Sequence, residues 1–117
     1  VQQLKEKVGK FVGERDWEQF HSPKNLSMSI AVEAAELMEV FQWHTIEESK
    51  KALKNSKRAI EDELADIMIY LLDFCNLYNI DVNKIVSDKL LKNQKKYPAR
   101  LVKGKHHKYW YYKGKSK

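Results

Sequence analysis

Four carboxylates in two short pairs are the residues of this chain whose types and spacing could do chemistry. Glu33 and Glu36 form one pair, and Glu63 and Asp66 form the other. Residues three apart on a helix share a face, so each pair would direct two oxygen ligands the same way. Crowded carboxylates repel one another unless a cation neutralises them, and hard oxygen ligands suit Mg²⁺ or, in its place, Mn²⁺. The pattern therefore predicts a metal site that handles phosphate.

Helices must position all four acids. Each pair lies within an apolar pattern of helical period, over residues 30–41 and 60–75. Few helix breakers interrupt the 117 residues, which hold two prolines and four glycines, and we find no strand-like alternation. The sequence predicts four main helices, over residues 2–14, 23–43, 57–78 and 82–97. A capping box of Thr45 and Glu48 predicts a short extra helix that ends near residue 55.

The predicted fold is all-α, a four-helix bundle with a short extra helix, and we expect it to assemble as a homo-oligomer. The helix over residues 57–78 has an apolar surface broader than the outside of a monomeric bundle requires. That surface consists of Ile60, Leu64, Ile67, Met68, Ile69, Leu71, Leu72, Phe74 and Cys75. Alanines at positions 31, 34 and 35 would let the preceding long helix approach a neighbour closely. We predict that part of this surface is buried against another subunit, in a homodimer or homotetramer.

The formal net charge of +6 comes from the end of the chain. Residues 99–117 hold seven Lys or Arg and no acid, whereas residues 1–98 hold 15 basic and 16 acidic residues. We therefore divide the chain into a helical domain, 1–98, and a basic aromatic tail, 99–117. Interleaved lysines and tyrosines could contact nucleic acid. A solvated end that docks partly through its aromatic rings is the favoured interpretation.

The composition narrows the class of protein. Apolar and charged fractions of 43% and 32% fit a soluble globular domain. The longest nearly uncharged apolar run, residues 67–72, is too short to cross a bilayer, so we expect no membrane association. No secretory segment opens the chain, and the lone Cys75 fits a buried, inert thiol better than a nucleophile. We therefore expect a cytoplasmic protein.

The acids belong to a longer ordered series of segments. In chain order these are Arg15-Asp16-Trp17-Glu18-Gln19-Phe20-His21, Glu33-Ala-Ala-Glu36-Leu-Met-Glu39, Phe41-Gln42-Trp43, Glu63-Leu-Ala-Asp66, Lys89 with Asn93, and Tyr97-Pro98. The series resembles the all-α nucleotide pyrophosphohydrolases of the MazG type, and most closely their dCTP pyrophosphatase branch. The resemblance covers residues 11–100 and implies a MazG-like bundle. One Glu-x-x-Glu pair is a weak signal, but the ordered set is specific.

The resemblance implies a Mg²⁺-dependent enzyme that splits nucleoside triphosphates between the α- and β-phosphates, giving a monophosphate and pyrophosphate. By resemblance, Glu33, Glu36, Glu63 and Asp66 are the metal ligands. Glu36 and Glu39 are the catalytic candidates, with Glu36 orienting or deprotonating the attacking water. Glu39 would be a more distant base or a further ligand, and a solvent-exposed glutamate is an equal alternative.

The resemblance also implies substrate-binding roles for Trp17, His21, Trp43, Tyr70, Lys89 and Asn93. The tryptophans could stack on the base, with Trp43 reaching a neighbouring subunit's site, and Tyr70 could pack beneath deoxyribose. His21 could bind a phosphate or cap the link between the first two helices. Lys89 and Asn93, four residues apart on one helix, could grip phosphate and sugar. The alternatives are aromatic side chains that anchor the core or an interface, and a solvated lysine.

The preferred base stays open at this point. The resemblance favours dCTP or modified dCTP as substrate, in the housecleaning of nucleotide pools. It departs at Val8, where the vertebrate members have a histidine that lines the base pocket, so base recognition would differ here. A broader pyrophosphohydrolase, or one that prefers dUTP or dATP, is the alternative within this class. A helical module that binds nucleic acid through the basic tail is the alternative from another class.

Overall fold

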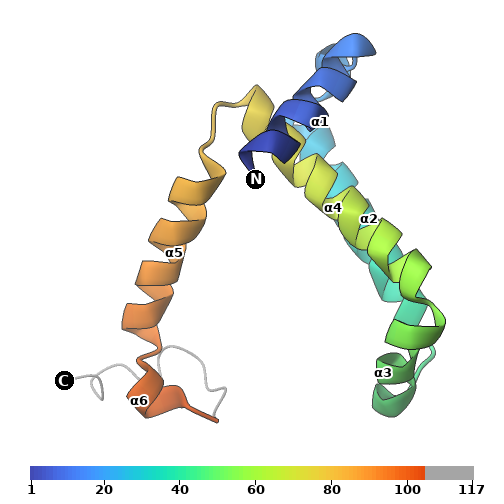
Figure 1. Ribbon diagram of the computed structural model, residues 1–117, viewed down its shortest axis with the longest axis vertical. Helices are drawn as coiled ribbons and strands as arrows, with labels where there is room; N and C mark the ends of the chain where they lie inside the picture. The colour runs from blue at the N-terminus through green and yellow to red at the C-terminus, as the bar shows by residue number, and fades with distance from the viewer. Residues whose placement is uncertain (105–117) are drawn as a thin grey trace. The chain divides into compact units, whose positions relative to one another are not determined.

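The computed structural model describes residues 1–104, and within them every regular element is helical (Figure 1). The chain divides into two compact units, one over Val1–Ile80 and the other from Asp81 onward. The first unit contains α1 (Gln2–Glu14), the 3₁₀ turn η1 (Glu18–Phe20), α2 (Pro23–Phe41), α3 (Ile46–Asn55) and α4 (Lys57–Leu77). The second contains α5 (Val82–Lys96) and α6 (Ala99–Val102). The all-α prediction is confirmed, whereas the predicted bundle of four helices stays a prediction.

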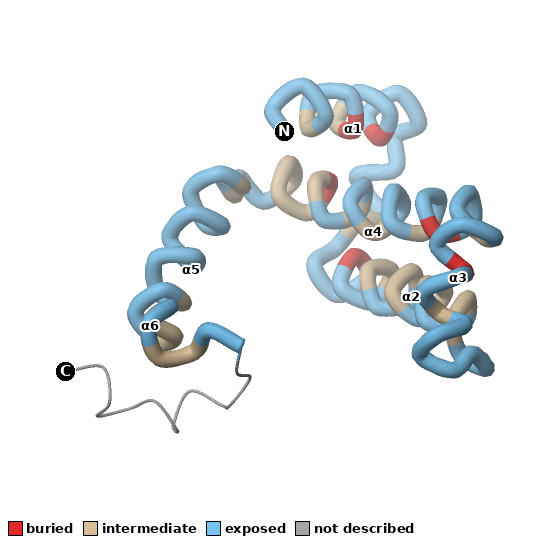
Figure 2. The backbone as a smooth tube through the Cα atoms, turned by 60° about the horizontal axis from the view of Figure 1, so that its bottom comes forward, coloured by how far each residue is buried: buried red, intermediate tan, exposed pale blue. Residues whose placement is uncertain are grey.

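Helix α4 is the central element of the first unit, because both α1 and α2 pack against it (Figure 2). The core of the first unit is small, and α3 also contributes to it. Its buried apolar side chains are Val8, Val12, Leu26, Ala52 and Ile60. Asn76 on α4 adds a polar link to α1, since its Nδ2 donates to the carbonyl of Lys5 at 2.7 Å. The packing of α2 along α4 matters most for function, because these two helices carry the paired acids.

Local signals at the helix ends explain why the elements begin where they do. Ser22 Oγ accepts a hydrogen bond from the amide of Asn25 at 3.1 Å, and Pro23 occupies the first turn of α2. Thr45 and Glu48 form the predicted capping box of α3, with bonds of 2.9 and 3.2 Å. Asp81 caps α5 through the amide of Lys84. These three N-caps confirm the starts of the helices that the sequence predicts.

The structure adds elements that the sequence does not predict. The turn η1 occupies the link over residues 15–21, and the short helix α6 falls within the predicted tail. Three helices end one or two residues before their predicted ends. The predicted boundary at residue 98 stays a prediction, and the basic aromatic end over residues 105–117 lies outside the described residues. Cys75 is half-buried rather than buried, and its thiol is free.

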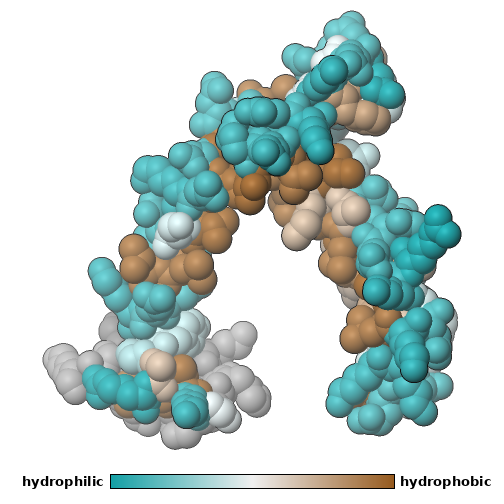
Figure 3. Space-filling model, in the orientation of Figure 1, coloured by the Kyte–Doolittle hydropathy of each residue, from teal (hydrophilic) through white to brown (hydrophobic). Residues whose placement is uncertain are grey.

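Part of the broad apolar surface predicted for α4 is exposed in the single chain, whereas Ile60 belongs to the core. Leu64, Met68, Ile69 and Leu71 keep between 41% and 62% of their surface open to solvent. Apolar side chains gather over α2 and α4 in the space-filling view (Figure 3). Single exposed apolar residues are normal on a soluble protein. Four of them on one helix form a larger apolar surface, of the kind that marks an interaction site. Among the described residues, no helix has the length and apolar character needed to span a membrane.

Candidate metal centre and adjoining cavity

Helices α2 and α4 bring three glutamates together where they pack. One carboxylate oxygen from each of Glu33, Glu36 and Glu63 lies within 4.8 Å of the other two. We call this set the three-glutamate cluster. The cluster forms because the spacing of Glu33 and Glu36 places both on one face of α2, and that face packs against α4 at Glu63.

The electrostatics of the cluster favour a cation. Burial raises the pKa of Glu33 to about 7, and the neighbouring carboxyls of Glu36, Glu63 and Asp66 contribute to the increase. Burial also raises the pKa of Glu63, with the charges of Glu36 and Asp66 acting in the same direction. A raised pKa means that the ionised acids are unfavourable here without a positive partner.

The carboxylate oxygens of the cluster are suitable ligands for a hard divalent cation. The Oε2 atoms of Glu33 and Glu63 are buried, and no hydrogen-bond donor among the described residues reaches them. Buried carboxylate oxygens without a donor are costly unless an ion or water satisfies them. Oxygen ligands of this kind suit Mg²⁺ and Mn²⁺. Asp66 lies outside the close set, but its charge acts on both Glu33 and Glu63.

A cavity of about 340 Å³ adjoins the cluster, and we call it the aromatic cavity. Its acidic wall comprises Glu33 and Asp66. The rest of the lining consists of Phe11, Val12, Trp17, His21, Ile69, Tyr70 and Asp73. Trp17 packs edge-to-face on Phe11, with the ring centroids 5.7 Å apart. A mostly apolar cavity with a few polar groups, at the lower end of ligand-site sizes, suits a small planar molecule.

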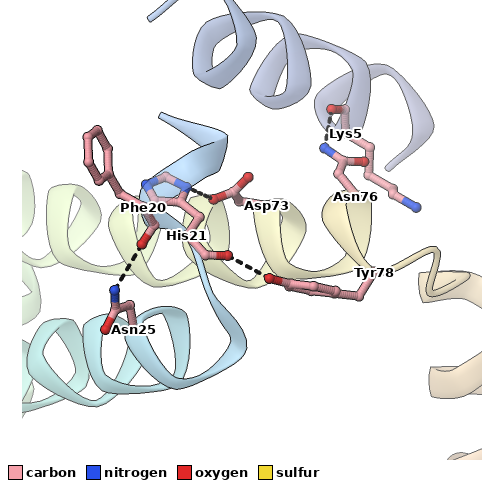
Figure 4. Close-up of polar contacts among 7 residues, drawn as sticks. All are labelled: Lys5, Phe20, His21, Asn25, Asp73, Asn76 and Tyr78. Carbon is pink, nitrogen blue, oxygen red and sulfur yellow. Dashed lines mark hydrogen bonds and ion pairs between the residues drawn. The ribbon is translucent and has the colours of Figure 1, made fainter. Parts of the chain in front are cut away.

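The link between α1 and α2 delivers Trp17 and His21 to this cavity. It reverses direction at Asp16, whose φ of 52° is one that aspartate tolerates better than most residues. Asn25 holds the far end of the link, because its Nδ2 donates to the carbonyl of Phe20 at 3.0 Å (Figure 4). Two local anchors therefore place two of the predicted substrate residues beside the acids.

Two other predicted site residues of the first unit, Trp43 and Glu39, lie outside the cavity wall. Trp43 is 86% exposed beyond the end of α2 and is not part of the cavity wall. Glu39 is exposed and lies outside the three-glutamate cluster, in a shallow hollow with Met38 and Gln42. Lys89 and Asn93 belong to the second unit, where they line a shallow pocket on α5. Their predicted roles stay predictions.

Sequence reasoning gave no site role to four lining residues, Phe11, Val12, Ile69 and Asp73, of which only Asp73 is charged. It is only 1% exposed, and its Oδ2 lies 2.5 Å from Nδ1 of His21 (Figure 4). Burial raises the pKa of Asp73, and the neighbouring His21 partly offsets the increase. Helical spacing could have indicated Asp73, because residues 66, 70 and 73 lie along one face of α4.

The chain is similar in sequence both to a protein-family profile and to individual known proteins. The profile of the MazG-like family matches residues 28–112. Over 101 residues, the chain is 41% identical to dCTP pyrophosphatase 1 of Bos taurus and 38% identical to that of Homo sapiens. These matches cover 85% of this chain but only 60% and 59% of the relatives, so the chain spans about three-fifths of their length.

A solved structure shares the fold. A pyrophosphatase from Archaeoglobus fulgidus superposes with a TM-score of 0.79 and is 40% identical in sequence. The match covers 83% of this chain and 91% of that one. The helical arrangement described here is therefore one that an experimentally determined pyrophosphatase also adopts.

Proposed function

The chain belongs to the MazG-like family, and from that premise we propose that it is a nucleoside triphosphate pyrophosphohydrolase. It cleaves deoxynucleoside triphosphates between the α- and β-phosphates and releases a deoxynucleoside monophosphate and pyrophosphate. The observation that carries the proposal is the three-glutamate cluster at the acidic wall of the aromatic cavity. The names of the relatives favour dCTP as the substrate. We extend the proposal to modified dCTP as a substrate and to the housecleaning of nucleotide pools as the role.

The proposal gives the acids the task of holding a divalent cation, Mg²⁺ in the first instance. Glu33, Glu36 and Glu63 would bind it, and Asp66 would add a fourth carboxylate from the cavity side. A bound cation supplies positive charge to the phosphates and lowers the pKa of a water molecule. Glu36 orients this water or accepts its proton, and Glu39 is the less central of the two catalytic candidates because it lies outside the cluster.

The aromatic cavity holds the nucleoside part of the substrate in this proposal. Trp17 offers an aromatic face for the base, and Tyr70 packs against the deoxyribose, where a 2′-hydroxyl would be crowded. His21 contributes a polar contact. Lys89 and Asn93 on α5 would bind phosphate and sugar, and Trp43 would reach the site of a neighbouring subunit.

We expect turnover to require a divalent cation and to depend on the base. A panel of the deoxynucleoside and ribonucleoside triphosphates, each assayed with Mg²⁺ and with EDTA, measures both. The account predicts the highest kcat/KM for dCTP or a modified dCTP, and no turnover in EDTA. A higher value for dUTP or dATP would favour the alternative base preference. Absence of turnover for every nucleotide would contradict the proposed activity.

The proposed assembly is a homodimer or homotetramer. Within residues 1–104 only five apolar side chains are buried, while four on α4 stay exposed. Burial of such side chains contributes about 1.5–3 kcal/mol each, so a second copy on this surface would stabilise a domain with a small core.

This assembly predicts that Met68→Glu shifts the protein towards monomer, because a charge would be buried in the interface. Sedimentation equilibrium measures the shift. Leu4→Glu is the matched control, since Leu4 is 55% exposed and lies on α1 instead of α4. A wild-type protein that is monomeric at micromolar concentration would exclude the assembly.

A further inference from the structure

Asp73 is the only buried charged side chain among the described residues, and the proposed reaction gives it no task. A carboxylate is costly to remove from water unless a partner compensates for the loss. Its partner is His21, whose Nδ1 lies 2.5 Å from Oδ2 of Asp73. The pair joins the link after α1 to the C-terminal half of α4, and both side chains line the aromatic cavity.

Several contacts fix the position of His21. Its backbone carbonyl accepts a hydrogen bond from the Tyr78 hydroxyl at 2.7 Å, and its amide donates to the carbonyl of Glu18 at 3.1 Å. Its ring lies beside that of Trp17, with centroids 6.4 Å apart. Figure 4 shows one edge of the imidazole facing Asp73 and the backbone carbonyl of His21 facing the Tyr78 hydroxyl. The ring therefore has one defined orientation.

This orientation leaves one polar atom of the imidazole for a ligand. The close contact between Nδ1 and a carboxylate oxygen requires a hydrogen between them, and it is assigned to Nδ1 because the oxygens of a carboxylate only accept. In the neutral ring Nε2 is then a hydrogen-bond acceptor. Nε2 lies on the opposite edge of the ring (Figure 4), and no residue among 1–104 forms a hydrogen bond with it.

The position of the pair indicates which part of a substrate it meets. Asp73 lies seven residues beyond Asp66 on α4, which is about 10 Å along the helix at 1.5 Å per residue. If the phosphates bind at the acids, the sugar and base extend along the cavity away from them. Trp17, the residue available for stacking, is next to His21. The side chain of His21 is therefore at the base end of the cavity.

We propose that the His21–Asp73 pair is the polar contact that selects the base, with Asp73 as a positioning residue that fixes the tautomer of His21. The inference rests on the proposed function. With its hydrogen on Nδ1, the imidazole presents an acceptor at Nε2, which matches a base that carries an exocyclic amino group. Cytosine has such a group where uracil has a carbonyl oxygen. The pair would thus favour cytosine over uracil at this edge.

Asp73→Asn tests this assignment because it keeps the size of the side chain and changes its hydrogen-bonding character. An asparagine amide can donate to Nδ1, and Nε2 would then carry the hydrogen and become a donor. At about pH 8.5, well above the ordinary histidine pKa, we expect the ratio of kcat/KM for dCTP to that for dUTP to fall at least about tenfold. The loss should appear mainly as a higher KM for dCTP.

Two further variants make the test decisive. His21→Gln should lower the same ratio even if Asp73→Asn does not fold, and Asp88→Asn, the same change at an exposed position on α5, should not. A ratio that stays at the wild-type value in Asp73→Asn or His21→Gln would overturn the inference and leave the pair a structural contact. A wild-type enzyme that turns over dUTP as well as dCTP would also overturn it.

Binding distinguishes failure of this inference from failure of the proposed function. Calorimetry with dCMP and dUMP needs no turnover, so it can be carried out on the wild-type protein and on His21→Gln whatever the panel of triphosphates shows. We expect the wild type to bind dCMP at least about tenfold more tightly than dUMP, and the variant to lose this difference. Equal binding of the two monophosphates by the wild type would contradict the inference independently of catalysis.

Discussion

Glu36→Gln and Glu63→Gln are each expected to lower kcat by more than about a hundredfold, because loss of a residue that only supports a metal ligand already costs ten- to a hundredfold. Glutamine keeps the size and one oxygen but removes the negative charge that holds a divalent cation. Both residues belong to the three-glutamate cluster. Steady-state kinetics over a range of Mg²⁺ concentrations measures the loss, and the Mg²⁺ concentration for half-maximal rate should rise with it.

The same substitutions should leave the fold intact. In EDTA their melting temperatures should equal or exceed that of the wild type, because the raised pKa values of Glu33 and Glu63 reflect unfavourable crowding of charge. Glu61→Gln is the matched control, since Glu61 lies on α4 near Glu63 but its side chain is 60% exposed. The control should retain wild-type kcat. Wild-type activity in either cluster variant would exclude the cluster as the metal site.

The second large effect concerns pH and stability in the absence of divalent cations. In EDTA, the free energy of unfolding should fall as the pH rises from about 5 to about 8. The pKa of Glu33 is about 7 in the folded protein and 4.5 in a free glutamate, so between these values the folded state binds more protons than the unfolded state. Stability then decreases with pH across that interval. We expect a decrease of about 1–2 kcal/mol after allowing for solvent at the site.

Saturating Mg²⁺ should reverse this trend. The cation competes with protons for the same carboxylates, so it stabilises the protein more at pH 8 than at pH 5. At a hundred times the dissociation constant, the stabilisation would be about 2.7 kcal/mol. Urea titrations at several pH values, with EDTA or Mg²⁺, measure both effects, and Glu33→Gln should flatten the slope in EDTA. A free energy of unfolding that increases from pH 5 to pH 8 in EDTA would contradict the raised pKa of Glu33 in the folded protein.

The sequence predicts the helices well because their signals are local. Ser22, Thr45 and Asp81 each cap a helix through an amide three residues later, and such contacts need no distant partner. The small helix α6 and the turn η1 were missed because neither has a strong cap or a repeating apolar pattern. Their form depends on the chain around them.

The candidate site was predictable in its parts and not in its arrangement. Helical spacing places Glu33 beside Glu36, but only the packing of α2 on α4 brings Glu63 to them and leaves Asp66 outside the close set. Asp73 was missed because an acid in an apolar run gives no sign of its partner. His21 is 52 positions away in sequence, and the fold of the link joins the two.

The products of hydrolysis test the central claim most directly. Phosphorus NMR of dCTP incubated with the protein and Mg²⁺ identifies which phosphate bond is broken. The account predicts dCMP and pyrophosphate as the only initial products, in equal amounts, with none formed in EDTA. Formation of dCDP and inorganic phosphate would show cleavage between the β- and γ-phosphates and would contradict it.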